Sequence, residues 1–166
     1  MARVYVSVGS NIEREHHVRA GIVALREKFG PLILSRVYES RAVGFDGDDF
    51  FNLVAAFDTD QSVQAVARTL RDIERANGRD RRVSHFSPRT LDLDLLLYGD
   101  AVLEEGEIKL PREEITRYAF VLGPLAEIAG EMRHPVLQRR FRELWDEFDR
   151  DGQPMRPVAW RPGAGA

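Results

Sequence analysis

Cysteine is absent from this sequence of 166 residues. That absence excludes disulfide bonds, thiolate zinc sites and a cysteine nucleophile. Any metal ion must therefore be held by carboxylates or imidazoles. The histidines show no spacing typical of metal ligands, and they lie at positions 16, 17, 85 and 134.

Two common phosphate-binding sequences are also missing. Neither G-x-x-x-x-G-K-[ST] nor G-x-G-x-x-G occurs in the chain. The first forms the Walker loop of many nucleotidases, and the second marks dinucleotide-binding folds. If the protein binds a phosphorylated ligand, it does so without either loop.

A basic excess and a long apolar run are absent as well. The net charge of -3 and the pI near 5.8 argue against a general nucleic-acid binder. No apolar run approaches transmembrane length, and the first residues enter a strand-like segment without a signal-peptide core. We therefore expect a cytoplasmic protein, with a monomer as the default, and neither nucleic acid nor membrane as a partner.

The size and composition favour a single domain. With 43% hydrophobic residues, the chain can build one core over residues 1–166. The segment 151–166 is rich in glycine and proline, and we expect it to order poorly unless Trp160 packs against the core.

Hydrophobic periodicity predicts alternating strands and helices. The pattern favours strand, helix, strand, strand, helix, strand, with Ser10 or Asn11 capping the first helix and Thr59 or Asp60 the second. This order is typical of a ferredoxin-like α+β sandwich, an antiparallel sheet with helices packed on it. The predicted ranges are 3–8, 13–29, 32–39, 50–58, 61–77 and the strand around 91–98, in that order.

A further part follows the last of these strands. The sequence predicts a short hairpin around Glu105 and Gly106, and then helices over 119–129 and 137–148. We expect these helices to form a C-terminal helical extension of the sandwich.

The stretch SPRTLDLDLLLYGD carries two carboxylates in a leucine-rich strand. Since side chains alternate along a strand, Asp92 and Asp94 point the same way and the leucines beside them point the other way. Six arginines lie between residues 71 and 89, just before this pair. Carboxylates hold Mg²⁺ and guanidinium groups bind phosphate, so the pattern indicates a magnesium–polyphosphate site. The alternative is an exposed strand end whose aspartates pair with nearby arginines.

Glu74 is a second unusual carboxylate. It falls in the last turn of the second predicted helix, where a negative charge opposes the helix dipole. It either forms a plain ion pair with Arg71 or contacts a ligand in the same cleft as the aspartates.

The segment GRDRRVSHFSPRTLDLDLLLYGD resembles the signature of the 6-hydroxymethyl-7,8-dihydropterin pyrophosphokinase family. VYVSVGSN near the start, FFNLVAAFDT in the middle, and LP followed by FVLGPLAEIAG near the end are similar to family segments in the same order. The resemblance implies a ferredoxin-like fold and transfer of diphosphate from ATP to a pterin alcohol, with release of AMP, in folate biosynthesis.

The resemblance also implies roles for individual residues. Two Mg²⁺ ions would be held by Asp92 and Asp94, and catalysis would use Arg79, Arg81 and Arg89. ATP would be bound by Glu74, Arg79, Arg89, Leu95, Ile108, Lys109 and Arg112. The pterin would be bound by Ser40, Ala42, Val43, Phe50, Asn52 and Phe120, with the two phenylalanines on opposite faces of its ring.

The sequence departs from the family pattern at several positions, and these leave two alternatives open. One is a paralogue that acts on a related pterin, and the other is a protein that binds pterin or nucleotide without turnover. An RNA-binding sheet is the rival from another class, but the acidic charge and aliphatic strands disfavour it. The departures are Arg41 and Ala42 for a proline pair, His85 and Phe86 for arginine–tryptophan, Arg112 and Glu113 for histidine–aromatic, and Tyr118 for arginine.

Overall fold

A computed structural model describes residues 1–41, 47–78 and 90–163. Its strands are β1 (Ala2–Ser10), β2 (Ile33–Leu34), β3 (Tyr38–Ser40), β4 (Phe50–Thr59), β5 (Asp92–Tyr98), β6 (Leu103–Glu105), β7 (Ile108–Leu110) and β8 (Met155–Pro157). Its helices are α1 (Arg14–Phe29), α2 (Val63–Ala76), the 3-10 helix Glu113–Thr116, α3 (Ala119–Ala129) and α4 (Phe141–Glu147).

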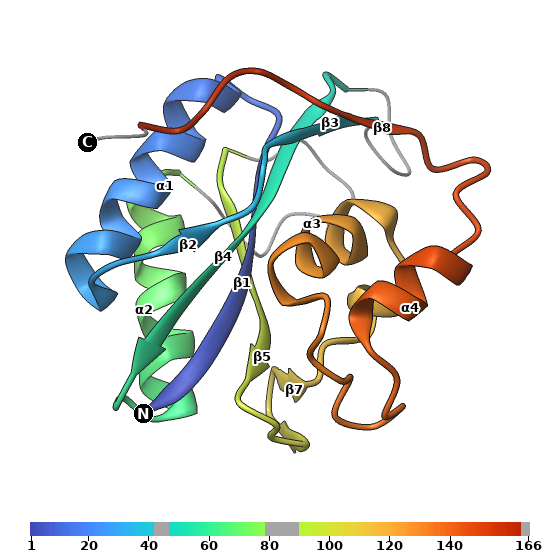
Figure 1. The fold of residues 1–166 in the computed structure, drawn as a ribbon. Helices are drawn as coiled ribbons and strands as arrows, with labels where there is room; N and C mark the ends of the chain where they lie inside the picture. The colour runs from blue at the N-terminus through green and yellow to red at the C-terminus, as the bar shows by residue number, and fades with distance from the viewer. Residues whose placement is uncertain (42–46, 79–89, 164–166) are drawn as a thin grey trace.

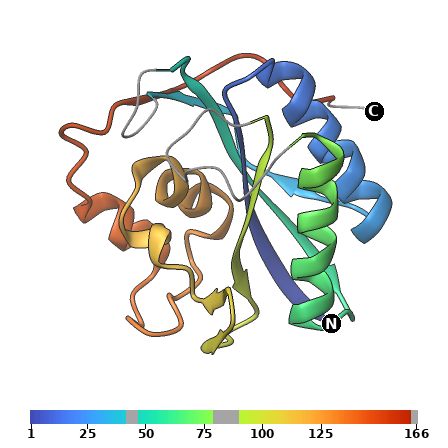
Figure 2. The same ribbon diagram turned by 180° about the vertical axis from the view of Figure 1, so that it is seen from behind.

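The main sheet is antiparallel and has helices on both faces. Its strand order is β5-β1-β4-β3-β8, with β2 also paired to β4, while β6 and β7 form a separate hairpin. Helices α1 and α2 cover one face and α3 and α4 lie against the other (Figures 1 and 2). The protein is thus a mixed α/β structure built on an antiparallel sheet.

Alternating residues of the central strands supply two cores. Val4, Val6 and Val8 of β1 pack with α1 and α2, whereas Tyr5 joins the core formed with α3 and α4. Because both faces are covered, β1 is buried from Val4 to Ser10. This central position makes β1 a rigid support for the two strands beside it, β4 and β5.

Several predicted elements are confirmed and others need correction. The predicted helix over 119–129 and the hairpin around Gly106 are present. The predicted strand over 32–39 is divided into β2 and β3, because the Ser35 side chain takes the place of a backbone carbonyl as the acceptor for an amide of β4. Its Oγ accepts a hydrogen bond from the Val54 amide at 2.9 Å. The predicted helix over 137–148 begins only at Phe141, and α2 is capped by Ser62 rather than by Thr59 or Asp60.

The turn between β1 and α1 also differs from the prediction. Neither Ser10 nor Asn11 caps α1, whose N-cap is Glu13 in the left-handed region at φ 43°. The Asn11 side chain instead donates to the Asp48 carbonyl at 3.0 Å. Asn11 therefore ties this turn to the residues that lead into β4.

The C-terminal segment returns to the sheet. Strand β8 pairs with β3, and the Trp160 ring stacks on Phe51 with 5.3 Å between centroids. The Arg19 guanidinium lies over the same tryptophan at 5.2 Å. Within the described ranges, no helix has the length and apolar character needed to cross a membrane.

Tyr38 and Glu127 join β3 to α3, and this link should depend on pH. The Tyr38 hydroxyl donates to the Glu127 carboxylate at 2.6 Å. Burial, together with this hydrogen bond, raises the pKa of Tyr38 from 10.0 to about 12. The unfolded chain therefore ionises first, so the contribution to stability is complete below pH 10 and is lost as the pH rises through 12.

Urea unfolding of the wild type and of Tyr38→Phe at pH 8 and pH 11 tests this link. The wild type should be the more stable protein at pH 8, and the difference between the two free energies of unfolding should shrink at pH 11. Glu127→Gln is the control that keeps the phenol and removes the charge. An unchanged difference between pH 8 and pH 11 would contradict the assignment.

Candidate active site

Three carboxylates meet near the start of β5, which is an edge strand of the main sheet. Asp92 and Asp94 lie two residues apart on this strand, and Glu74 reaches them from α2. One oxygen from each of the three lies within 4.8 Å of the others. Glu74 is 1% exposed and Asp92 6%, so the cluster is largely shielded from water.

Glu74 also contacts the strand that carries the aspartates. Its Oε2 accepts a hydrogen bond from the Leu93 amide at 2.7 Å. Leu93 lies between Asp92 and Asp94, so this bond fixes the backbone from which both aspartates project. Glu74 also forms the ion pair with Arg71, at 3.4 Å, which confirms that interpretation, while the contact of Glu74 with a ligand stays a prediction.

The donor set fits a hard divalent cation such as Mg²⁺. Carboxylate oxygens are the ligands that this ion prefers, and a cation would offset the mutual repulsion of three clustered carboxylates. The side chains of Asp92 and Asp94 share one face, as the alternation along the strand predicted, while Leu93 packs in the core with α1 and α2.

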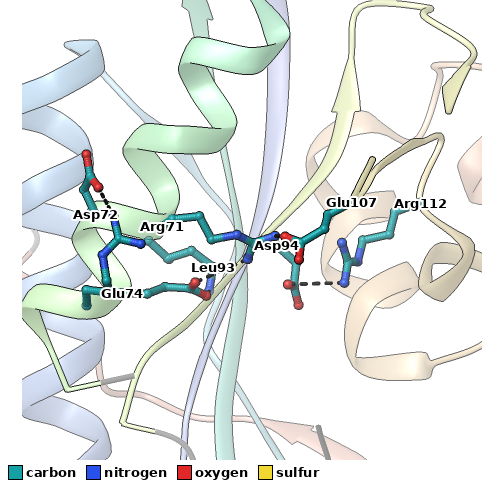
Figure 3. A network of polar contacts seen from close by, with 8 residues as sticks. Arg71, Asp72, Glu74, Leu93, Asp94, Glu107 and Arg112 are labelled. Carbon is teal, nitrogen blue, oxygen red and sulfur yellow. Dashed lines mark hydrogen bonds and ion pairs between the residues drawn. The ribbon is translucent and has the colours of Figure 1, made fainter. Parts of the chain in front are cut away.

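Two arginines flank the carboxylates (Figure 3). Arg71 bridges Glu74 and Glu107, and its distance to the Glu107 carboxylate is 3.2 Å. Arg112 lies 3.4 Å from Asp94 and 2.5 Å from Glu114. Burial of the Arg112 guanidinium opposes its charge, but Asp94 and Glu114 outweigh that effect and hold its pKa above the ordinary value. Positive charge is therefore fixed beside the acidic cluster.

Four of the seven residues predicted to bind ATP line one pocket, whereas Glu74 is not among its lining residues and Arg79 and Arg89 lie outside the described residues. Leu95, Ile108, Lys109 and Arg112 line it, between α2, β5 and β7, and Asp94 lies in the same wall. Lys109 is exposed, and its ammonium group contacts Glu113 at 2.7 Å. Arg71, which the sequence placed among the six arginines before the aspartates, lines this pocket too, as does Glu107, which sequence reasoning missed. No sequence pattern connects these two residues, because they are 36 positions apart.

Of the residues predicted to bind the pterin, Ser40, Phe50 and Asn52 lie on the paired strands β3 and β4, and Phe120 lies in α3. Asn52 donates from Nδ2 to Ser40 Oγ at 2.7 Å, and both side chains are buried. Phe50 is the register partner of Ser40. Phe120 in the first turn of α3 lines a cavity of about 600 Å³ together with Ser40 and Arg41. The stacking of a pterin between Phe50 and Phe120 stays a prediction.

A glycine shapes the Asn52 side of this site. A Cβ atom on Gly9 would lie 2.8 Å from Asn52 Oδ1, which is closer than a methyl carbon can approach. Gly9 and Asn52 are register partners on β1 and β4. The absence of a side chain at residue 9 therefore leaves room for the Asn52 amide.

Several predicted site residues lie outside the described residues. They are Arg79, Arg81 and Arg89 for catalysis and ATP, Ala42 and Val43 for the pterin, and the departures His85 and Phe86. Among the other departures, Arg112 contacts Asp94, and the Tyr118 ring stacks on Phe120 with 5.1 Å between centroids.

The fold and the cluster of carboxylates beside fixed guanidinium groups are typical of proteins that bind phosphorylated nucleotides with a divalent cation. Comparison with known families narrows this class. The family model described as 7,8-dihydro-6-hydroxymethylpterin-pyrophosphokinase (HPPK) matches residues 5–130. The chain belongs to this family, which confirms the resemblance found in the sequence.

Two curated relatives are similar over most of their length. The 2-amino-4-hydroxy-6-hydroxymethyldihydropteridine pyrophosphokinase of Aquifex aeolicus (strain VF5) is 32% identical over 149 residues, which cover 89% of this chain and 92% of the relative. The protein of the same name from Pseudomonas aeruginosa is 37% identical over 137 residues, covering 80% and 84%.

Two solved structures share the fold. A crystal structure of HPPK-DHPS in complex with substrates has a TM-score of 0.71 at 12% identity, over 87% of this chain. Wild-type HPPK-DHPS of Plasmodium falciparum with STZ-DHP has a TM-score of 0.70 at 12% identity, over 88% of this chain. The match spans only 43% and 41% of those two solved chains.

Proposed function

We propose that this chain transfers a diphosphate group from ATP to 6-hydroxymethyl-7,8-dihydropterin and releases AMP, as a step of folate biosynthesis. The family match over residues 5–130 carries the proposal, and the identity of 32–37% to relatives named as pyrophosphokinases supports it. The alternatives of a divergent paralogue and a non-catalytic binding protein are not favoured by those relatives.

The acidic cluster would hold the metal. Asp92 and Asp94 would bind Mg²⁺, with two ions expected, and Glu74 would fix the strand between them through its bond to Leu93. When bound, Mg²⁺ would neutralise charge on the ATP phosphates. Arg71 and Arg112 would add cationic groups on either side of the phosphates.

The nucleotide and the pterin would occupy neighbouring sites. Leu95, Ile108 and Lys109 would contact the adenosine part of ATP, in the pocket beside Asp94. Asn52 and Ser40 would recognise the polar edge of the pterin, and Phe50 and Phe120 would lie on its faces. We also propose that Arg79, Arg81 and Arg89 bind the phosphates and that Ala42 and Val43 contact the pterin.

The reaction would need little covalent work from the protein. The hydroxymethyl oxygen of the pterin would form a bond to the β-phosphorus of ATP, and the bond from that phosphorus to the bridging oxygen of AMP would break. The alcohol proton would pass to solvent, and AMP would leave with the bridging oxygen. Positioning of the two substrates and neutralisation of phosphate charge would supply most of the rate.

We also propose the finer architecture. The order β5-β1-β4-β3, with α1 and α2 on one face, supports a ferredoxin-like sandwich, and α3 and α4 would be its C-terminal helical extension. The whole of residues 1–166 would form one domain, acting as a monomer in the cytoplasm.

AMP release is the experiment that tests the proposed function. The protein is incubated with ATP and Mg²⁺, with and without 6-hydroxymethyl-7,8-dihydropterin, and AMP is separated from ADP by chromatography. The expected result is AMP formation that requires both the pterin and Mg²⁺. If ATP and the pterin bind but no AMP forms, the protein is a binding protein and the proposal is wrong.

A further inference from the structure

The cavity that contains Phe120 has a second wall outside the family match. One side of this cavity is formed by Ser40, Arg41 and Phe120, and the other by residues 150–155. Figure 1 shows this C-terminal segment running from α4 to β8, where it lies alongside β3. The family match ends at residue 130, so it does not include residues 150–155.

Gln153 connects this wall to the start of α3. Its Oε1 accepts a hydrogen bond from the Ala119 amide at 2.9 Å, and its Nε2 donates to the Arg117 carbonyl at 3.2 Å. The first amides of a helix have no partner within the helix, and the N-cap residue Tyr118 makes no side-chain cap bond here. Gln153 therefore supplies the missing cap from a distant part of the chain.

Phe120 is the residue that this cap holds in place. It follows Ala119 directly, so the bond from Gln153 fixes the turn from which the Phe120 ring projects into the cavity. Loss of the bond would free the first turn of α3 to fray. The ring would then lose a defined orientation.

The wall is anchored on both sides of the cavity. Met155 pairs with Ser40 in the β8–β3 ladder, and its side chain also packs against α3 at Gly123. A side chain at Gly123 would collide with Met155 and with the Trp145 ring. Because residue 123 is a glycine, the wall can pack against the surface of α3. The wall therefore contacts both β3 and α3.

We infer that residues 150–155 form a wall of the pterin site and that Gln153 is a positioning residue for Phe120, so that this wall sets the affinity for the pterin. The inference rests on the proposed function, because the ligand of the cavity is the pterin substrate. The wall shares no residue with the pocket beside Asp94. It should therefore affect the pterin and leave the nucleotide unchanged.

Binding measurements on two Gln153 variants test the inference. Gln153→Met keeps the length of the side chain and loses both hydrogen bonds, whereas Gln153→Glu keeps the acceptor for the Ala119 amide. The dissociation constant of 6-hydroxymethyl-7,8-dihydropterin is measured by calorimetry at saturating Mg²⁺ and α,β-methylene-ATP. This analogue cannot lose AMP, because the bridging oxygen is replaced by carbon.

The substitution Gln153→Met should weaken the binding of the pterin and leave the binding of the nucleotide unchanged. Gln153→Met should raise the dissociation constant of the pterin about tenfold, the effect of about one lost hydrogen bond. Gln153→Glu should stay within about threefold of the wild type, since a carboxylate also suits a helix N-terminus. Neither variant should change the dissociation constant of the nucleotide. Gln61→Met, at an exposed residue before α2, is the matched control.

Three results would overturn the inference. If Gln153→Met binds the pterin as tightly as the wild type, the wall does not position Phe120, although the proposed function stands. If pterin and nucleotide affinities fall equally, Gln153 has only a general structural role. If the wild type itself releases no AMP and binds no pterin, the proposed function fails and this inference fails with it.

Discussion

Asp94→Asn should lower the rate of pterin-dependent AMP formation by at least about a hundredfold, and Asp92→Asn should do the same. Each substitution keeps the size of the side chain and removes one negative charge from a cluster in which three carboxylate oxygens lie within 4.8 Å. A neutral amide is a poorer ligand for Mg²⁺ than a carboxylate. The measurement is the initial rate of AMP release over a range of Mg²⁺ concentrations.

The control for this experiment is another aspartate on the same part of the chain. Asp100 lies in the exposed turn after β5, and Asp100→Asn should have the activity of the wild type. Both site variants should still fold, which circular dichroism would verify. Wild-type rates and unchanged magnesium dependence in Asp92→Asn and Asp94→Asn would show that the cluster does not serve the reaction.

Gly9→Ala should weaken pterin binding by at least about tenfold while leaving nucleotide binding unchanged. The added methyl group would lie 2.8 Å from Asn52 Oδ1, so the Asn52 amide would have to move. Asn52 is only 4% exposed and is held by Ser40 Oγ at 2.7 Å, which leaves little space for the movement. The amide would then leave the position in which we propose that it binds the polar edge of the pterin.

A double substitution tests whether Gly9→Ala weakens pterin binding by displacing the Asn52 amide. Asn52→Ala should weaken pterin binding by itself, and adding Gly9→Ala to it should cost little more, because the colliding amide is already gone. The dissociation constant of the pterin is measured for the wild type, the two single variants and the double variant, with Mg²⁺ and α,β-methylene-ATP present. Additive effects of the two substitutions would mean that Gly9 acts in another way.

Local patterns in the sequence predicted much of the fold. Alternating valines predicted β1, and the helical spacing of apolar residues predicted α1 and α2. The sequence did not show the late start of α4, because the residues before it form a turn in which His134 Nδ1 accepts from the Val136 and Leu137 amides and Gln138 has a φ of 59°. The division into β2 and β3 likewise depends on one side-chain contact, between Ser35 and the Val54 amide.

The sequence predicted those parts of the candidate site that depend on residues close together in the chain. Alternation along one strand placed Asp92 and Asp94 on a common face, and the opposed helix dipole singled out Glu74. The contact from Glu74 to the Leu93 amide depends on how α2 packs against β5, so no local pattern contains it. The cap that Gln153 provides for α3 joins residues 34 positions apart, and its flanking glycine and proline suggested only an irregular tail.

The pairing of β8 with β3 also concerns how the molecules behave toward one another in solution. A bare strand edge is a template for a strand of another chain, and β8 covers the edge of β3. The Val158 amide donates to Val37, so by alternation the neighbouring Pro157 nitrogen faces outward, and it carries no hydrogen to offer. A short strand that ends in proline therefore covers this edge of the sheet and disfavours pairing with another chain there.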